Sequence, residues 1–231
     1  MNNIEKLKAK TQRGERCIGI TVSMALPLVS ELLGEVGYDF LMIDMEHGAM
    51  SLETAMGHVL AARGAGTAPL IRVPSNEAVL VKPYLEMHPA GVIVPRINNA
   101  ADVKTAVESC RYPPKGIRGF GPSRGMRFGL VGQVEYIEQV DEQIMVIPQI
   151  EHYQAVEEMD RVAAVQALTL SESDAIIQAN LVSYVDDRET YDLTDGEQRI
   201  NSVLDRSDGD AARTLRDLWS STNEDYPITV Y

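Results

Sequence analysis

Residues 43–48 (IDMEHG) bring two carboxylates and an imidazole together where an apolar run gives way to polar residues. If the run is a strand, its alternation sends Asp44 and Glu46 to one side. A histidine held by a carboxylate is a suitable general base near neutral pH, which makes His47 a candidate proton carrier. The alternative interpretation of this segment alone is a surface loop with a helix-capping acid.

Two further apolar runs carry polar residues of useful types. Arg72 lies inside residues 70–74 (LIRVP), and a buried arginine is rare unless it is paired. It could clamp a substrate carboxylate or a developing enolate, or it could form an ion pair with a neighbouring acid. Gln149 and Glu151 end the run at 147–152 (IPQIEH), where Glu151 could ligate a hard cation such as Mg²⁺ or Mn²⁺.

The elements that would position these residues alternate along the first 165 residues. Strand-like runs rich in Val, Ile and Leu are 17–22, 40–45, 68–73, 91–97 and 144–150. Segments with helical spacing are 26–36, 52–63, 77–87, 101–111 and 153–165, with Ser51 placed to cap one helix and Gly37 to end another.

Five strand–helix units predict an α/β fold with a parallel sheet and right-handed crossovers. A doubly wound sheet and a TIM-type (β/α)₈ barrel both fit this pattern. The barrel is favoured because polar residues, Arg96 among them, fall at the carboxyl ends of the strands, where barrel active sites are built.

Charge divides the chain into two predicted parts. The net charge is −13, of which residues 1–165 carry −4 (16 basic, 20 acidic) and residues 166–231 carry −9 (5 basic, 14 acidic). We therefore expect a barrel portion at 1–165 and an acidic C-terminal segment at 166–231. The acidic balance argues against a nucleic-acid partner, which needs a basic face.

No apolar run approaches the ~20 residues of a membrane span, no signal peptide is visible, and two cysteines suit a reducing cytoplasm.

The remaining motifs give weaker indications of function. The loop at 112–132 is rich in glycine and proline, and long irregular loops of this kind are usually functional. No strand carries a lysine suited to Schiff-base chemistry, and Lys82 falls on a predicted helix. The remaining histidines, His58, His88 and His152, are expected to be structural or solvated, His152 at the start of a helix.

Four strings in order resemble the HpcH/HpaI aldolase family: GYDFLMIDMEHG (37–48), APLIRVPSNE (68–77), residues 91–124, and VIPQIEH (146–152). The resemblance covers about residues 15–165. It implies a (β/α)₈ barrel, often assembled as hexamers of paired subunits. It also implies a class II pyruvate aldolase that cleaves 4-hydroxy-2-oxo acids with the help of Mg²⁺, Mn²⁺ or Co²⁺.

The resemblance also implies a role for individual residues. His47 matches the acid/base histidine and Asp44 the acid that pairs with it. Arg72 matches the arginine that faces the substrate oxo group, and Gln149 an amide that contacts substrate. Glu151 matches the first of two metal-binding carboxylates. In addition, Glu86 stands where the family usually has a supporting aspartate.

The chain departs from the family after Val165. The expected G-P-x-D-L-S strand, which supplies the second metal carboxylate and cradles the pyruvate carboxylate, is absent; Asp174 and Asp192 are the nearest acids by spacing or context. Strand-like runs at 168–170 and 227–231 and polar helices at 173–185 and 209–219 are all that the tail predicts, so the barrel is expected to be incomplete after its fifth unit. Two interpretations follow: an aldolase whose tail supplies a substitute ligand, or a non-catalytic barrel fragment that binds oxo acids or associates with intact subunits.

Overall fold

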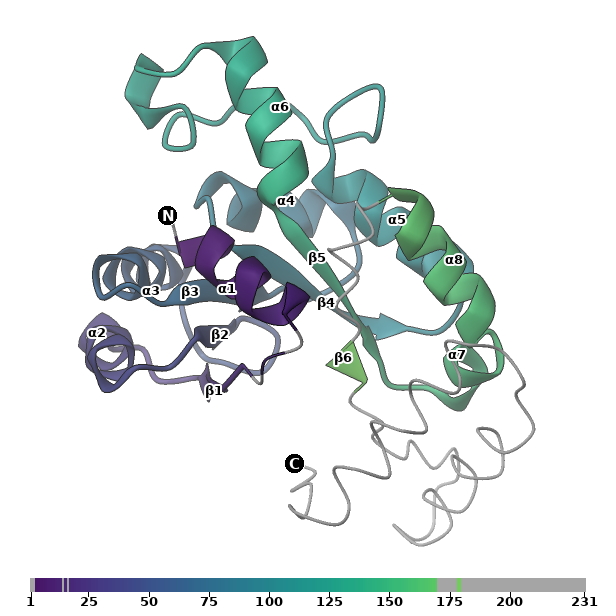
Figure 1. The fold of residues 1–231 in the computed structure, drawn as a ribbon, viewed down its shortest axis with the longest axis horizontal. Coiled ribbons are helices and arrows are strands. Elements are labelled where there is room, and N and C mark those ends of the chain that lie inside the picture. Colours follow the sequence, from purple (N-terminus) through teal and green to yellow (C-terminus); the bar gives the residue numbers. More distant parts are fainter. Residues whose placement is uncertain (1–2, 14, 16, 170–177, 180–231) are drawn as a thin grey trace, which may run out of the picture.

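A computed structural model describes residues 3–13, 15, 17–169 and 178–179. Its centre is a parallel sheet whose strands are hydrogen-bonded in chain order, β1 to β6 (Figure 1). The strands are β1 Gly19–Val22, β2 Phe40–Asp44, β3 Ala68–Arg72, β4 Gly91–Ile97, β5 Met145–Ile150 and β6 Gln178–Ala179. A doubly wound sheet reverses its strand order at a switch point, whereas a barrel keeps sequential order, and this sheet keeps it.

Apart from the first helix, which precedes β1, helices follow the strands and cover the outer side of the sheet (Figure 1). They are α1 Asn3–Gln12, α2 Pro27–Val36, α3 Leu52–Gly64, α4 Ala78–Glu86, α5 Ala100–Cys110, a 3₁₀ turn Arg127–Gly129, α6 Gln133–Gln143, α7 Tyr153–Glu157 and α8 Met159–Thr169. Ser51 caps α3 by accepting a hydrogen bond from the Thr54 amide, and Gly37 ends α2 with a φ of 102°. Within the described ranges, no helix has both the length and the apolar character needed to cross a membrane.

The predicted fold class is confirmed, with differences in detail. The five predicted strands and the first four predicted helices form close to their expected bounds. The predicted helix 153–165 is two helices, and the strand expected at 168–170 is wrong at its first two residues, which end α8. Within the expected helix 173–185, residues 178–179 form β6 instead. The elements expected at 209–219 and 227–231 lie outside the described residues.

The sequence analysis did not predict two helices, α1 and α6. Their apolar positions are few and separated, and most of the burial on α1 comes from Ile4 and Leu7, which are 6% and 4% exposed. These two residues join a cluster with the inward residues of several strands. The N-terminal helix therefore packs against the inward residues of the sheet, and a local sequence pattern cannot predict this long-range contact.

Strand alternation separates two cores. Inward residues such as Met42, Leu70 and Ile147 pack with α1, while the intervening residues, such as Ile43 and Ile71, pack against the outer helices. Side chains alternate along a strand, so every second residue points inward. Near the carboxyl ends of β2, β3 and β5, these inward-pointing residues are polar. The fold thus ends its apolar interior in a layer of Asp, Arg and Gln side chains.

Candidate active site

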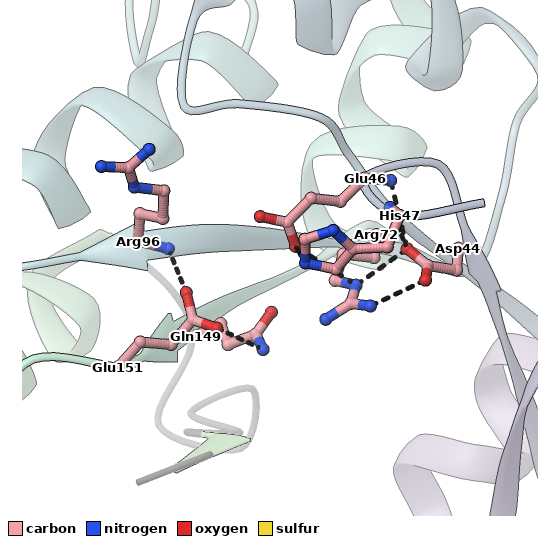
Figure 2. A network of polar contacts seen from close by, with 7 residues as sticks. All are labelled: Asp44, Glu46, His47, Arg72, Arg96, Gln149 and Glu151. Atoms are coloured by element: carbon pink, nitrogen blue, oxygen red, sulfur yellow. Dashed lines mark hydrogen bonds and ion pairs between the residues drawn. The ribbon is translucent and has the colours of Figure 1, made fainter. Parts of the chain in front are cut away.

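Asp44 and Arg72 form the centre of the site at the carboxyl ends of β2 and β3. The two residues are register partners in the sheet. Arg72 donates from Nε to Asp44 Oδ1 at 3.0 Å and from Nη2 to Oδ2 at 2.7 Å, a two-point charge-assisted pair (Figure 2). Their side chains are only 12% and 5% exposed, so this arginine is both buried and paired.

Asp44 also organises the turn that follows β2. Its Oδ1 accepts the backbone N–H groups of Glu46 and His47 at 3.1 and 3.2 Å. The resemblance had suggested that Asp44 pairs with the imidazole of His47. Instead, the imidazole Nε2 lies 3.5 Å from Glu46 Oε2, because the Asp44 carboxylate is engaged by Arg72 and by the turn. His47 itself is largely exposed, with 72% of its side chain accessible.

Burial and charge shift the pKa values of this cluster in opposite directions. Burial alone would raise the pKa of Asp44, but the Arg72 guanidinium and the turn amides outweigh it and hold the pKa below its ordinary value. Burial likewise opposes the charge of Arg72, yet its bond to Asp44 raises the pKa of the guanidinium. The pKa of Glu46 is raised because burial outweighs the opposing charges of Arg72 and His47, and the charges of Glu151 and Asp44 add to the increase.

A second group of side chains lies at the ends of β4 and β5. Gln149 Nε2 donates to Glu151 Oε1 at 3.0 Å, and the backbone N–H of Arg96 donates to Glu151 Oε2 at 2.8 Å (Figure 2). The Arg96 bond depends on a register shift between Val94 and Ile97, where Arg96 takes a φ of 58°. Such a bulge re-aims the backbone at a sheet end, and here it points an amide at Glu151.

The two groups of side chains lie at the same end of the sheet, the carboxyl ends of the strands. The charge of Glu151 acts on both Arg72 and Glu46, which places the β5 carboxylate within electrostatic reach of the β2–β3 cluster. The structure therefore brings Arg72, Gln149 and Glu151 to the same strand ends, with His47 at the exposed rim. Glu46 is a site residue to which the sequence assigned no role; its position at a strand end was the available signal.

Oxygen donors suited to a hard cation lie in this site. Gln149 Oε1 is a buried acceptor without a hydrogen-bond partner in the described part of the chain, and Glu151 adds a carboxylate. Glu46 Oε2 also makes no hydrogen bond there, but it lies 3.4 Å from Arg72 Nε and 3.5 Å from His47 Nε2. Oxygen ligands of this kind suit Mg²⁺ or Mn²⁺. No three His, Cys, Asp or Glu side chains among the described residues form a metal-binding group. The residues present fit a cation held by Glu151 with few protein ligands.

Other predicted residues lie elsewhere. Glu86 ends α4 and pairs with Arg118 at 3.3 Å rather than with any residue of the cluster. His58 is fully buried, with its Nδ1 2.8 Å from the Ser30 hydroxyl, as a structural histidine should be. His152 precedes α7 and accepts the Gln154 amide at 3.3 Å.

The tail acids and the long loop contribute no described residue to the strand-end site. Asp174 and Asp192, the candidates for a second carboxylate, lie outside the described residues. The loop at 112–132 follows the carboxyl end of α5. Because helices run back against the strands they connect, this loop lies at the amino ends of the strands, opposite the site.

A sequential parallel sheet with polar groups at its carboxyl ends defines a protein of the (β/α)-barrel class. The chain belongs to the HpcH/HpaI aldolase/citrate lyase family, whose sequence model matches residues 18–201. That match extends past Val165, where the resemblance seen in the sequence ends.

Two curated relatives of the chain carry the same name. The chain is 36% identical over 160 residues to the 5-keto-4-deoxy-D-glucarate aldolase of Enterobacter sp. (strain 638), and 34% identical over 164 residues to that of Escherichia coli (strain K12 / DH10B). These alignments cover 69% and 71% of this chain. They span 62% and 63% of the relatives, so the chain matches less than two thirds of their length.

Solved structures agree with the fold. A HpcH/HpaI aldolase/citrate lyase family protein from Burkholderia cenocepacia J2315 superposes with a TM-score of 0.67 at 26% identity, covering 87% of this chain and 80% of that one. A citrate synthase, SbnG, gives 0.66 at 26% identity, covering 95% and 87%. The HpcH/HpaI aldolase from Desulfitobacterium hafniense DCB-2 gives 0.68 at 22% identity, covering 97% and 99%, and supports the fold alone.

Proposed function

We propose that the protein is a divalent-metal-dependent aldolase that cleaves 4-hydroxy-2-oxo acids to pyruvate and an aldehyde. The observation that carries the proposal is the buried Asp44–Arg72 pair set beside Gln149 and Glu151 at one end of the sheet. Family membership adds the reaction class. The name of the aligned relatives favours a substrate derived from a sugar diacid, such as 5-keto-4-deoxy-D-glucarate.

Each residue has a task in this reaction. Asp44 holds Nε and Nη2 of Arg72, and Nη1 makes no hydrogen bond with any residue that the structure describes, so it is available to the substrate oxo group. As the C3–C4 bond breaks, its electron pair passes to C3 and the carbonyl, and Arg72 stabilises the enolate oxygen. His47, exposed at the rim and 3.5 Å from Glu46, accepts the proton of the 4-hydroxyl group. A proton delivered to C3 then completes pyruvate.

Gln149 and Glu151 support the oxo-acid end of the substrate. The buried amide of Gln149 donates to Glu151 and keeps one oxygen unpartnered among the described residues. Glu151, with Gln149 in support, would hold Mg²⁺, Mn²⁺ or Co²⁺, which supplies Lewis-acid polarisation of the substrate carbonyl when bound. The side chain of Gln149 also helps to exclude water from the site, since Gln149 is 1% exposed.

The test is pyruvate release from a panel of 4-hydroxy-2-oxo acids, measured before and after chelation and after adding each metal back. We expect chelation to abolish activity and Mg²⁺, Mn²⁺ or Co²⁺ to restore it. The Glu151→Gln variant should lose the metal response, while Glu53→Gln on α3 should keep it. Trapping of a borohydride-reducible adduct with pyruvate would instead establish lysine chemistry and refute the proposal.

The second candidate is a non-catalytic barrel portion that binds oxo acids or associates with intact subunits. It is favoured by one observation: no group of three His, Cys, Asp or Glu side chains that could hold a metal ion forms within the described part of the chain. Pyruvate binding without turnover, at any metal concentration, would select this function over the first.

We further propose that the protein acts in the cytoplasm as a homo-oligomer on a small oxo acid, with residues 166–231 as a distinct acidic segment. Support for assembly comes from the turn before α6, which projects from the sheet (Figure 1). Phe128 and Leu130 there are each 80% exposed, and Val134 is 70% exposed. Apolar side chains gathered at a projecting tip suit burial against a second copy of the chain.

A further inference from the structure

A pocket of about 210 Å³ lies at the opposite end of the strands from the proposed active site. It is lined by Asn3, Ile4, Arg63, Pro69, His88 and Ala90. Pro69 lies at the beginning of β3, Ala90 directly precedes β4, and α1 packs against β3 beside them (Figure 1). From Pro69 to Arg72 the strand advances three residues, about 10 Å, so the pocket is separate from the strand-end site.

The pocket is cationic and its charge is not balanced. Arg63 donates to the His88 carbonyl at 2.9 Å but has no carboxylate partner among the described residues. Its pKa is lowered first by burial and then by the charge of Arg124, which is likewise unpaired within the described ranges. Arg118, by contrast, has Glu86 at 3.3 Å. Two half-buried arginines therefore lie within electrostatic reach of each other and have no carboxylate partner among the described residues, although a charge removed from water is normally paired.

His88 brings an unpartnered polar atom to the same place. Burial, followed by the charges of Arg63, Arg118 and Arg124, lowers the pKa of His88 to about 4. Its ring is therefore neutral at pH 7, with one nitrogen able to donate. His88 Nδ1 and Arg124 Nε are both buried without a hydrogen-bond partner in the described part of the protein. The backbone of His88 also has a φ of 58°, a strained conformation for a residue other than glycine.

The long glycine- and proline-rich loop supplies part of this cluster. Arg118 anchors the loop by donating to the Leu85 carbonyl and by stacking 4.6 Å from the centre of the Tyr112 ring. With Arg118 fixed, Arg124 on the same loop is brought within electrostatic reach of Arg63 and His88. The loop is thus placed to complete a binding site at the amino ends of the strands.

We propose that Arg63, His88 and Arg124 form a binding site for a small oxyanion, a phosphate or carboxylate group, independent of the proposed aldolase site. An anion would balance two unpaired guanidinium groups and give His88 Nδ1 and Arg124 Nε their missing acceptor. The volume is below the 300–1,000 Å³ of drug-sized ligand sites, which limits the occupant to a small molecule or to a phosphate or carboxylate group of a larger one.

The test titrates inorganic phosphate, and separately succinate, into the full chain at constant ionic strength, while calorimetry and the His88 ring resonances follow binding. We expect saturable binding that shifts the His88 resonances. Phosphate as the tighter ligand assigns the site to phosphate groups, and succinate as the tighter ligand assigns it to carboxylates. The Arg124→Gln and Arg63→Gln variants should each weaken binding by at least about tenfold, the loss expected for one charge-assisted contact.

Two control variants distinguish binding in this pocket from binding elsewhere on the protein. Arg127→Gln removes the same charge from an exposed position on the same loop and should leave the dissociation constant unchanged. Arg72→Gln disables the proposed aldolase site and should also leave it unchanged, so that either proposal can fail without the other. The Arg124 side chain makes no hydrogen bond to a described residue, so its variant should fold even if Arg63→Gln does not.

Three results would overturn the proposal. One is the absence of saturable binding of either anion, and another is binding that Arg124→Gln leaves intact. The third is phosphate-induced dissociation of an oligomer in sedimentation experiments, which would show that a carboxylate of a second copy of the chain fills the pocket.

Discussion

Replacement of Asp44 by Asn should destabilise the protein strongly, because it breaks one side of a buried ion pair. The change keeps Oδ1 for the two turn amides and for Arg72 Nε at 3.0 Å, but it removes the negative charge and sets an amide NH2 against Arg72 Nη2 in place of the 2.7 Å bond. Breaking one side of a buried pair costs about 3–5 kcal/mol. Because the amide retains one acceptor, we expect the lower end, about 3 kcal/mol, or a fall of roughly 6–12 °C in Tm for a chain of this size.

The assay is urea unfolding followed by circular dichroism, for wild type, Asp44→Asn, Arg72→Gln and the double variant. The coupling free energy in this cycle should be about 2 kcal/mol or more, since the two residues are in direct contact. Glu108→Gln, which removes an exposed i,i+4 partner of Lys104, serves as the control and should change stability by less than about 0.5 kcal/mol.

Acidity provides a second check on the same reasoning. The pKa of Asp44 is lowered in the folded protein, so its contribution to stability is full above the ordinary value of 3.8 and is lost as the pH falls through the depressed folded value. The difference between wild type and Asp44→Asn should therefore shrink below about pH 3.8. A coupling free energy under about 0.5 kcal/mol, or a difference that does not change in acid, would refute the ion-pair account.

Three further outcomes are expected. His47→Gln should lower kcat for pyruvate release by about 10²–10⁴-fold with little change in KM, and a change confined to KM would rule out its proton-transfer role. The pKa of His88 is about 4 in the folded protein and 6.5 ordinarily, so the unfolded chain binds a proton first as the pH falls. About 3 kcal/mol of stability should therefore be lost between pH 6.5 and 4, and in acid unfolding curves the His88→Gln variant should lose less. Replacing Phe128 and Leu130 together by Ser should shift light-scattering mass toward the monomer without lowering Tm by more than a few degrees, and an unchanged mass would exclude this tip from the subunit interface.

The alternation of strands and helices was predictable from local sequence. A buried parallel strand must be a short apolar run, and a helix that covers it must be apolar on one stripe, so both periods are written in consecutive residues. Ser51 and Gly37 act locally as well, through a side-chain cap and a left-handed backbone. For the same reason the sequence predicted that Arg72 and Glu151 lie at the carboxyl ends of strands, and therefore at the same end of the sheet.

Only the tertiary structure decided which groups meet. Asp44 bonds the guanidinium of Arg72 rather than the imidazole of His47, because strand pairing sets those two residues side by side while the turn carries the imidazole toward solvent. The bulge at Arg96 depends on the register with β5.

The long loop shows the same limit. Its composition marked it as irregular, but its place opposite the strand-end site and beside Arg63 and His88 follows from the direction of α5 and from the anchoring of Arg118. Local sequence sets the conformation of a segment, whereas partners separated by 28 to 55 residues, as in the pairs Asp44–Arg72 and Arg96–Glu151, are chosen by packing of the whole sheet.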